Sequence, residues 1–467
     1  EGEEEEEGVE GEGGGEGGAA KKKKKNKKKK KKPTGEGANA GAPATAGQPG
    51  GLDTMDTKLL SQTIARLSGD DEGGSSGVPE VSPDGHAFWG TQPMRRQDLP
   101  LDRVGPIEPE DKVVMQEPYK LPSGFHWCTC NVDDDKEMDD VYALLNENYV
   151  EDDDHMFRFD YSHNFLRWAL TPPGYTHDWH LGVRADKSDK LVGFITGIPA
   201  TIRAWEEKFT AVEINFLCVH KRLRAKRLAP MLIKEVTRRV NCKGIFQAVY
   251  TAGAVLPTPV ARCRYYHRSL NPKKLIEVGF SRLAPRMTMA RTLRLYKLPD
   301  QPVTPGLKQL EPRHVASAAK LLETHLLKFK LVTHFSAAEF AHWFLTRDNV
   351  VYCYVVEDPA KPDEVTDMVS FYSLPSTIIN NKQYPTLNAA YSFYNVATTV
   401  SFQALLNDAL IVARNLNFDV FNALNILENE ETLKELKFGI GDGHLQYYLY
   451  NWGCPDMEPK QVGLVLL

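Results

Sequence analysis

The sequence has no apolar run near the roughly 18 residues that a membrane-spanning helix needs, and it has no secretory signal pattern. Its cysteines number seven, which is odd, and none forms a CxxC pair. No group of His and Cys has the spacing of a zinc site. We therefore expect a soluble cytosolic protein with free thiols and no bound metal.

The first 84 residues lack the apolar side chains that a folded core requires. Residues 1–20 hold nine Glu and no aromatic residue, and Lys21–Lys32 is lysine throughout except at Asn26. Such a segment buries too little apolar surface to offset the entropy of ordering it, so we expect 1–84 to be disordered apart from a short helix at 57–67.

The lysines of 21–32 suit an anionic partner such as RNA, the ribosome or acidic lipid. A solubilising tail or a nuclear-localisation-like run is the alternative interpretation. Because no aromatic residue interleaves the lysines, we expect no sequence-specific recognition of nucleic acid.

One stretch, 213–240, combines a strand, a basic turn and a helix. Residues 213–219 are β-branched, aromatic and mostly apolar, which is typical of a buried strand. Residues 220–227 carry six basic side chains, and from Leu228 apolar residues recur at helical spacing. Cations beside a helix N-terminus form a site for a polyanion such as a pyrophosphate. A solvated surface turn is the other interpretation.

The order of the expected elements indicates a mixed α/β sheet. After an extended segment at 91–124 that wraps the surface, we predict helices at 139–148 and 165–170 and strands at 125–132, 180–183, 191–198, 210–219 and 245–250. Meander strands followed by strand, basic loop, helix and strand fit a sheet whose loop after a central strand holds a cofactor pyrophosphate.

The second half repeats part of this order without its cations. The paired segments are 214–219 with 391–396, 228–240 with 405–414, and 244–249 with 418–423. The turn at 397–402 has no basic residue. We interpret the pairs as an internal pseudo-repeat whose first copy alone keeps an anion site, which leaves the second free for another role such as holding an acceptor. Generic β–α–β units are the alternative.

Three further stretches have unusual patterns. An acidic turn at 151–154 precedes Phe157, Phe159 and Tyr161, which alternate and should face one way. This pair of features suits either recognition of a cationic peptide or a solvated loop beside core aromatics. Residues 437–443 contain three glycines and predict a tight turn. The apolar end, 462–467, should lie inside the protein, where a buried α-carboxylate can act as a base; an edge strand ending in solvent is the alternative.

These stretches together resemble the eukaryotic glycylpeptide N-myristoyltransferase family. The motifs that carry the resemblance are EINFLCVHKRLRAKR (213–227), KFGIGDG (437–443), YVEDDDHMFRFDY (149–161), FQAVYTAG (246–253), 391–396 and the terminal GLVLL. The resemblance covers about 86–467. It implies an α/β fold of two acetyltransferase-like (GNAT) halves related by a pseudo-two-fold, at 85–290 and 291–467, with myristoyl-CoA on the first half and the peptide mostly on the second. We expect a monomer.

The resemblance also implies a direct transfer of myristate to an N-terminal glycine amine. The backbone N–H groups of Phe216 and Leu217 would form the oxyanion hole, and the Leu467 carboxylate would be the general base. The residues implied to contact the cofactor are Ala87, Phe88, Trp89, Phe216, Leu217, Cys218, Val219, Arg224, Ala225, Lys226, Arg227, Leu228 and Ala229. Those implied to contact the peptide are Asn215, Thr251, Tyr149, Asp152, Asp154, Phe157, Phe159, Tyr161, Tyr265, His267, Ser376 and Asp442.

The chemistry agrees with these roles. A thioester needs only polarisation of its carbonyl, and an α-ammonium with a pKa near 8 must lose a proton before it attacks. No covalent intermediate is required, so Cys218, in an apolar strand, is expected to pack rather than to act as a nucleophile. Ala225 departs from the serine, and Tyr266 from the tryptophan, that is usual in the family. Two rivals remain: a transferase that uses a shorter acyl-CoA, and a ribosome- or RNA-binding adaptor with an inactive fold.

Overall fold

The computed structural model describes residues 88–96, 103–150 and 155–467. The predicted tail at 1–84, with its short helix, lies outside the described residues. The helices are α2 (Asp135–Asn148), α3 (His163–Leu170), α4 (Leu228–Asn241), α5 (Pro272–Glu277), α6 (Met289–Leu295), α7 (Val315–Leu326), α8 (Ala337–Phe344), α9 (Phe402–Asn415) and α10 (Glu430–Leu433). Short 3-10 helices lie at Trp89–Thr91, His177–Trp179, Lys221–Lys226, Pro312–His314 and Pro459–Gln461.

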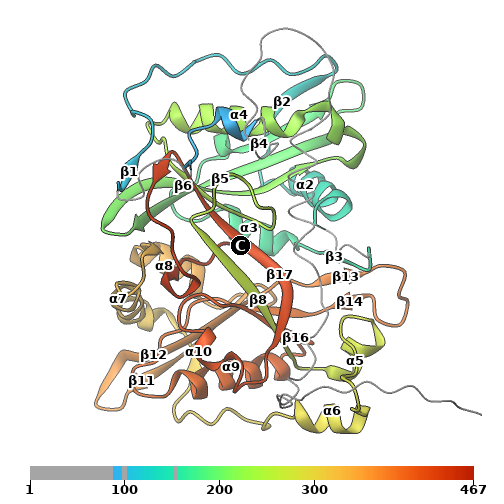
Figure 1. The fold of residues 1–467 in the computed structure, drawn as a ribbon, viewed down its shortest axis with the longest axis vertical. Coiled ribbons are helices and arrows are strands. Elements are labelled where there is room, and N and C mark those ends of the chain that lie inside the picture. The colour runs from blue at the N-terminus through green and yellow to red at the C-terminus, as the bar shows by residue number, and fades with distance from the viewer. Residues whose placement is uncertain (1–87, 97–102, 151–154) are drawn as a thin grey trace, which may run out of the picture. The chain divides into compact units, whose positions relative to one another are not determined.

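A mixed sheet of fourteen strands runs through these residues, with helices packed against it (Figure 1). Its strands are β2 (Phe125–Thr129), β4 (His180–Ala185), β5 (Leu191–Ala204), β6 (Glu207–Val219), β7 (Ala248–Ala252), β8 (Ala261–Ser269), β9 (Lys308–Gln309), β10 (Leu331–Thr333), β11 (Val351–Asp358), β12 (Lys361–Ser373), β15 (Ala389–Ser392), β16 (Val420–Leu424), β17 (Gly439–Tyr450) and β19 (Val462–Gly463). Two small sheets hold β1 (Gly105–Pro106) with β18 (Trp452–Gly453), and β3 (Phe157–Phe159) with β13 (Ser376–Ile378) and β14 (Thr386–Leu387).

Two series of five strands have the same order and meet at the centre of the sheet, which confirms the predicted internal repeat. From β4 the order runs β4-β5-β6-β7-β17, and from β11 it runs β11-β12-β15-β16-β8. In both series the first pairs are antiparallel, and the third and fourth strands are parallel and joined through a helix, α4 or α9. The fifth strand of each series comes from the other half. These two strands, β8 and β17, pair with each other at the centre of the sheet (Figure 1).

The predicted helices and strands of the first half are confirmed, with shifted ends. Helix α2 begins earlier than predicted because the Asp134 side chain accepts a hydrogen bond from the Glu137 N–H and caps the first turn. Helix α4 begins at Leu228, as the apolar spacing predicts, and it buries Leu232 and Val236 against the sheet. Strand β5 is longer than predicted.

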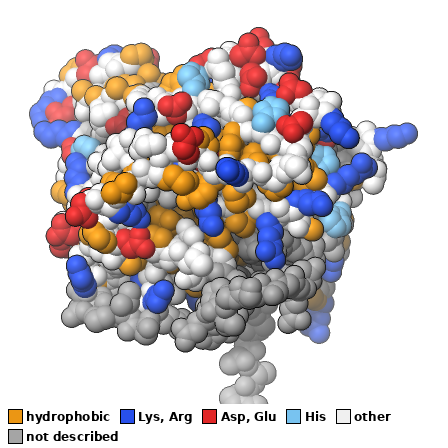
Figure 2. All heavy atoms as spheres, turned by 90° about the horizontal axis from the view of Figure 1, so that it is seen from above, with side chains coloured by type: hydrophobic (Ala, Val, Ile, Leu, Met, Phe, Trp, Pro, Cys, Tyr) orange, Lys and Arg blue, Asp and Glu red, His pale blue; other side chains and the backbone are white. Residues whose placement is uncertain are grey.

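Residues 103–124 of the extended segment run over α4 and form hydrogen bonds with it. The buried Glu235 carboxylate accepts a hydrogen bond from the Tyr119 N–H at 3.1 Å and pairs with Arg238 at 2.7 Å. Arg238 in turn donates to the Gln116 carbonyl at 2.9 Å. Seen from above, this side of the molecule mixes charges of both signs with exposed apolar side chains (Figure 2).

The prediction of a turn at 437–443 is wrong, because most of this stretch belongs to strand β17. The register of β17 against β8 shifts between Ile440 and His444, so the glycines form a bulge rather than a turn. A Cβ atom on Gly441 would lie 2.5 Å from His267 Nε2, which explains why this bulge has no side chain there.

The turn after β15 is held closed by an internal carboxylate. The Asp367 carboxylate accepts hydrogen bonds from the N–H groups of Thr398, Thr399 and Val400 at 2.7, 2.9 and 3.3 Å. The Thr399 hydroxyl also donates to it, as does that of Thr366 at 2.7 Å. An internal carboxylate therefore holds the turn that precedes α9 closed.

The first half has no carboxylate at the corresponding position. Val396 bridges Met368 in the second half, and Val219 pairs with Gly193 in the first. By this register Asp367 corresponds to Val192. In the first half the corresponding Lys221 and Arg222 N–H groups are accepted by Asn148 Oδ1 at 3.0 Å and by His220 Nδ1 at 3.3 Å.

We predict that Asp367→Asn destabilises the protein by about 3 kcal/mol, because it leaves buried N–H donors without a charged acceptor. Burial alone would raise the pKa of Asp367. The hydrogen bonds from Thr399 and Thr366 outweigh this effect, so the pKa of Asp367 is lowered. This contribution to stability is therefore present at neutral pH and is lost as the pH falls below the pKa of an unfolded aspartate. Urea unfolding at neutral and acid pH measures both effects.

The matched control is Asp363→Asn, whose exposed carboxylate pairs with Arg313 and should change stability by less than about 1 kcal/mol. Equal stability of the Asp367→Asn variant and the parent chain would contradict the role assigned to Asp367.

Candidate functional site

Strand β6 parts from β7 after only two paired residues. Along its other side β6 pairs with β5 over most of its length, but it pairs with β7 only at Val212 and Glu213. Phe216 has a positive φ of 56°, and the register against β5 shifts between Phe194 and Thr196. For a bulky residue such a φ is strained. This break turns the end of β6 away from β7 and opens the sheet.

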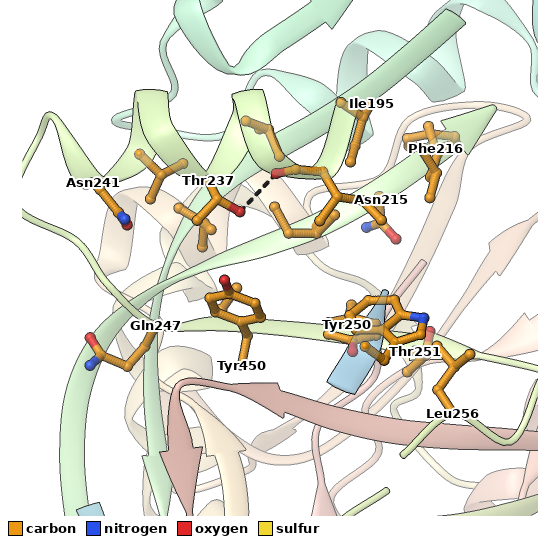
Figure 3. A pocket seen from close by; sticks show the side chains of 18 of the residues that line it. Ile195, Asn215, Phe216, Thr237, Asn241, Gln247, Tyr250, Thr251, Leu256 and Tyr450 are labelled. Atoms are coloured by element: carbon orange, nitrogen blue, oxygen red, sulfur yellow. Dashed lines mark hydrogen bonds between the residues drawn. The ribbon is translucent and has the colours of Figure 1, made fainter. Parts of the chain in front are cut away.

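A mainly apolar cavity of about 90 Å³ lies in this opening, and it is lined by α4, β6, β7 and Tyr450 of β17. Its aliphatic wall comes from Ile195, Val212, Ile214, Ile233, Val236, Val240 and Ala248. Figure 3 shows Asn241 and Gln247 at one end and Phe216 and Thr251 at the other. The Thr237 hydroxyl donates to the Ile233 carbonyl at 2.8 Å, so it leaves the α4 wall without a free donor at that point.

Polar groups gather at the Phe216 end of this cavity. The Phe216 N–H faces the Tyr149 hydroxyl, and the Tyr149 ring packs on the Phe216 ring at 6.1 Å. Desolvation raises the pKa of Tyr149, so its hydroxyl stays neutral. Asn215 and Thr251 line the same space from β6 and β7. Main-chain donors and neutral side chains thus meet where an apolar cavity opens.

The basic loop lies at the end of β6, next to this cavity. Residues 221–226 form a 3-10 helix, and Arg227 adopts a left-handed conformation with φ 56° before α4 begins. Arg224 donates to the Asn148 carbonyl at 2.7 Å, whereas the Lys226 and Arg227 residues are exposed. The loop therefore presents cations at the N-terminus of a 14-residue helix.

The last residues of the chain run into the protein between the two halves (Figure 1). Leu464 and Leu466 are buried, the Tyr447 hydroxyl donates to the Leu464 carbonyl at 2.9 Å, and the Val465 N–H donates to the Tyr394 hydroxyl at 3.0 Å. The prediction that this apolar segment lies inside is confirmed. Leu467 lines a second cavity, of about 30 Å³, together with Glu213.

Six of the predicted site residues come together on the wall of the 90 Å³ cavity: Trp89, Tyr149, Asn215, Phe216, Leu217 and Thr251. Trp89 belongs to a short 3-10 helix far from β6 in sequence, and it stacks on Tyr250 of β7 at 5.8 Å. Phe88 packs beside Trp89. Leu228 and Ala229 are buried in the first turn of α4, and the exposed Ala225 precedes them in the basic loop.

The other described residues predicted to contact the peptide do not line this cavity. Ser376 pairs with Phe159 across β3 and β13, and Phe157 packs on Phe280, while Tyr161 packs on Phe216. His267 on β8 is buried with its Nδ1 2.6 Å from Asn422 Oδ1, whereas Asp442 is exposed on the β17 bulge. Tyr265 lines another small cavity with Leu466. Ala87, Asp152 and Asp154 lie outside the described residues.

Cys218 packs in the core, as the sequence analysis predicts. It is 1% exposed on β6, and burial raises the pKa of its thiol to about 12. Its Sγ makes one weak contact, to the Leu144 carbonyl at 3.9 Å. The thiol is therefore protonated at neutral pH and is a poor nucleophile.

Sequence reasoning missed Glu213, whose carboxylate accepts a hydrogen bond from Asn215 Nδ2 at 2.7 Å. Desolvation raises the pKa of Glu213 to about 7. The available signal was an acidic residue at the start of an apolar strand, which is costly unless it has a use. Sequence reasoning also left the cavity wall unassigned, because its residues come from both the strands and the helix.

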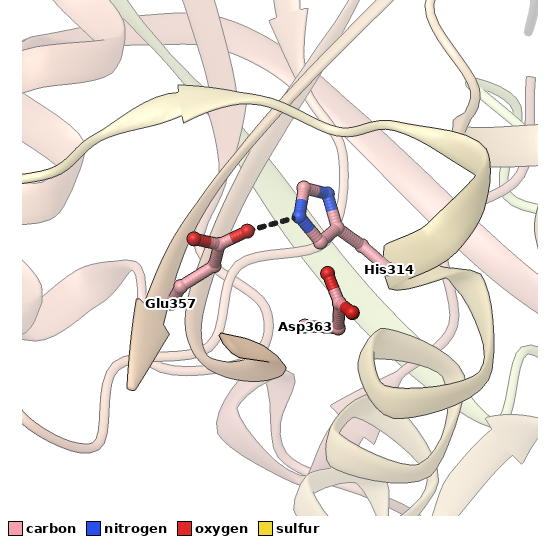
Figure 4. Close-up of side chains that lie close together, drawn as sticks. All are labelled: His314, Glu357 and Asp363. Atoms are coloured by element: carbon pink, nitrogen blue, oxygen red, sulfur yellow. Dashed lines mark hydrogen bonds and ion pairs between the residues drawn. The ribbon is translucent and has the colours of Figure 1, made fainter. Parts of the chain in front are cut away.

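One group of His and acidic side chains within the described residues is compact enough for a metal: His314, Glu357 and Asp363 (Figure 4). Its atoms already have partners. His314 Nε2 lies 2.6 Å from Glu357, and His314 Nδ1 accepts from the Glu311 N–H at 3.0 Å. Arg313 pairs with Asp363 and, at 2.6 Å, with Glu357. This is an ion-pair cluster rather than a metal centre.

Comparison with known proteins identifies the family. Residues 106–263 match "Myristoyl-CoA:protein N-myristoyltransferase, N-terminal domain", and residues 277–465 match the C-terminal domain of the same family. The chain belongs to the N-myristoyltransferase family. The predicted resemblance is thereby confirmed.

This N-myristoyltransferase family member is similar to named relatives over most of their length. Glycylpeptide N-tetradecanoyltransferase 1 of Arabidopsis thaliana is 57% identical over 389 residues, which cover 82% of this chain and 89% of the relative. The Drosophila melanogaster enzyme is 53% identical, over 82% of this chain and 81% of its own. A solved structure of Saccharomyces cerevisiae N-myristoyltransferase with bound myristoyl-CoA has a TM-score of 0.79 at 42% identity and covers 82% of this chain and 100% of that one.

Across the described ranges, no helix combines the length and the apolar character that crossing a membrane requires.

Proposed function

We propose that this protein transfers a tetradecanoyl group from tetradecanoyl-CoA to the amine of an N-terminal glycine. The observation that carries the proposal is the apolar cavity that opens at Phe216 and Leu217, beside a basic helix N-terminus. An acyl-CoA needs these two environments next to each other, one for its chain and one for its phosphates. Relatives that are 57% and 53% identical to this chain are named as glycylpeptide N-tetradecanoyltransferases.

The thioester carbonyl would lie at the Phe216 end of the cavity. The break in β6 leaves the Phe216 N–H facing the Tyr149 hydroxyl, and Leu217 follows Phe216 on the cavity wall, where their N–H groups would meet the carbonyl. Two amides aimed at the carbonyl oxygen stabilise the charge that develops there when the amine attacks. The fixed backbone costs no reorganisation at that moment.

The acceptor amine must lose a proton before it attacks, because an α-ammonium has a pKa of about 8. In the proposed reaction the Leu467 carboxylate takes this proton, while Asn215 and Thr251 orient the amine. The new C–N bond forms and the C–S bond breaks, and the CoA thiolate leaves with the electron pair. Of the two protons that nitrogen loses, one neutralises the thiolate and the other passes to solvent.

The remaining contacts divide between the two substrates. Arg224, Lys226 and Arg227 would hold the CoA phosphates at the start of α4, and Phe88 and Trp89 would cover the thioester end. Val219, Ala225, Leu228 and Ala229 would complete that loop. The acceptor peptide would contact Tyr149, Phe157, Phe159 and Tyr161, then Tyr265, His267, Ser376 and Asp442. The charges of Asp152 and Asp154 would attract a basic residue of the peptide.

We predict that the protein converts tetradecanoyl-CoA and a peptide with an N-terminal glycine into an acylated peptide and free CoA, as followed by mass spectrometry and thiol release. A peptide with an acetylated glycine is the control and should not react. Faster transfer from acetyl-CoA would contradict the chain-length assignment. Tight binding of tetradecanoyl-CoA without any transfer would instead support an adaptor with an inactive fold.

Chain length should depend on the end of the cavity beside Ala248, which pairs with Val212 next to the final β6–β7 pair of Glu213 and Val249. We predict that Ala248→Leu fills this end. A C14 donor gains about 0.8 kcal/mol per buried methylene over a shorter one, so two methylenes give about tenfold in kcat/KM over a C12 donor. The variant should lose this preference, and Ala290→Leu, at an exposed alanine of α6, should keep it.

We also propose that Lys21–Lys32, with eleven lysines, associates with a polyanionic surface such as the ribosome. Eleven closely spaced cations release counterions on binding, so the association should weaken steeply with salt. Cosedimentation of the full chain with ribosomes, with and without replacement of these lysines by glutamine, measures this. Sedimentation that is equal for both chains at every salt concentration would contradict the proposal.

A further inference from the structure

Glu213 is an acidic residue in the site to which the reaction described above gives no task. It is the last residue of β6 that pairs with β7, so it lies at the point where the sheet opens. Two residues further along the strand, Asn215 lines the larger cavity, and Glu213 itself lines the smaller one. Glu213 thus lies between the proposed site of acyl transfer and a second, separate space.

Two contacts fix the Glu213 carboxylate. Asn215 Nδ2 donates to Oε1 at 2.7 Å, and the main chain of Leu467 provides a second hydrogen bond. One of these partners is proposed to orient the substrate amine, and the other carries the proposed base. The Glu213 carboxylate therefore connects the two groups that meet the amine.

The second cavity, of about 30 Å³, can hold water, because a site needs only about 10–15 Å³ of such volume for one molecule. Its polar lining comes from Glu213, Leu467, Thr333, Glu339 and Tyr394. Waters there would have several hydrogen-bonding partners, which ordered internal waters require.

The titratable groups that face this cavity are all acids. Besides Glu213 and the Leu467 carboxylate they are Tyr394, whose hydroxyl accepts from the Val465 N–H, and Glu339 of α8, which accepts from the Ser336 N–H at 2.8 Å. Among the described residues that line it, none is Lys, Arg or His. Desolvation raises the pKa of Glu213 to about 7, although Asn215 and Leu467 oppose the rise. Without a cation to hold it ionised, this carboxyl group can gain and lose a proton near neutral pH.

We propose that Glu213 is a positioning and proton-relay residue, which fixes the main chain of Leu467 and passes the proton taken from the glycine ammonium on to the water of the second cavity. This role rests on the proposed function. The proton leaves the substrate nitrogen for the Leu467 carboxylate, moves to the Glu213 carboxylate and then to water. Glu213 makes and breaks no bond to carbon, so the relay leaves the acyl transfer itself unchanged.

The relay has a defined pH dependence. Above its own pKa, Glu213 is ionised and can accept the proton; below it, the group is already protonated and the route is blocked. The value of kcat should therefore rise with pH through an acid limb near neutral pH, and kcat is the informative constant because it reports groups in the ternary complex.

The test compares Glu213→Gln, Glu213→Asp and Glu339→Gln with the unaltered chain from about pH 6 to about pH 8.5, a range that brackets the pKa of an α-ammonium. Gln keeps an acceptor for the Leu467 N–H but cannot relay a proton. We expect Glu213→Gln to lose the acid limb and to lower kcat at the upper end of the range by about tenfold or more. Its Kd for tetradecanoyl-CoA, measured by calorimetry, should change less than about twofold, because Glu213 does not line the acyl cavity.

The two other variants separate a relay from plain packing. Glu213→Asp keeps a carboxylate and should keep the limb with a reduced kcat, and it supplies the test if Glu213→Gln does not fold. Glu339→Gln makes the same chemical change on the wall of the same cavity, where the side chain caps α8, and it should leave the profile unchanged. A Glu213→Gln profile that keeps its limb, whether kcat is lowered or not, overturns the relay. Absence of transfer by the unaltered chain overturns the proposed function, and the relay with it.

Discussion

The site depends on the early separation of β6 from β7. Two residues, Val212 and Glu213, hold the strands together, and the positive φ of Phe216 then turns β6 away. The strain of that conformation is maintained by the long pairing of β6 with β5 on its other side. The cavity, the inward-facing amide of Phe216 and the position of Glu213 all follow from this one opening in the sheet.

The site also needs a wall on the far side of the cavity, and the second half of the doubled fold supplies it. Strand β17 comes from the second half and pairs with β7, so its Tyr450 lines the cavity that the first half opens. The chain then returns, and its last residues enter between the halves under the hydroxyls of Tyr394 and Tyr447. Neither half alone could build the site, because each takes its fifth strand from the other.

The two halves differ in the turns that precede their equivalent helices, α4 and α9. In the second half Asp367 accepts three backbone N–H groups at the turn before α9, whereas the first half has Val192 at that register and a basic loop before α4. In the first half the corresponding N–H groups, those of Lys221 and Arg222, are accepted by Asn148 Oδ1 and His220 Nδ1, so the two turns differ in their cations rather than in a free set of donors.

The sequence predicted the mixed sheet, the α4 boundary, the repeat and the buried chain end, because each depends on local periodicity or on a contiguous motif. It did not predict the glycine bulge of β17, since the need for glycine at 441 comes from His267 on another strand. The roles of Glu213 and Asp367 were also not predicted, because their hydrogen-bond partners are distant in sequence, at Leu467 and at 398–400. The predicted peptide residues lie on several elements whose grouping depends on tertiary pairing, as between Phe159 and Ser376.

The most direct test of the account is a crystal structure of the protein with a non-reactive thioether analogue of tetradecanoyl-CoA. We expect the alkyl chain of an S-(2-oxoalkyl) analogue to fill the cavity between α4 and β7, and its ketone oxygen to lie within hydrogen-bonding distance of the Phe216 and Leu217 amides. We expect its phosphates to contact the basic loop before α4. An alkyl chain bound elsewhere, or phosphates at the turn that Asp367 closes, would contradict the account.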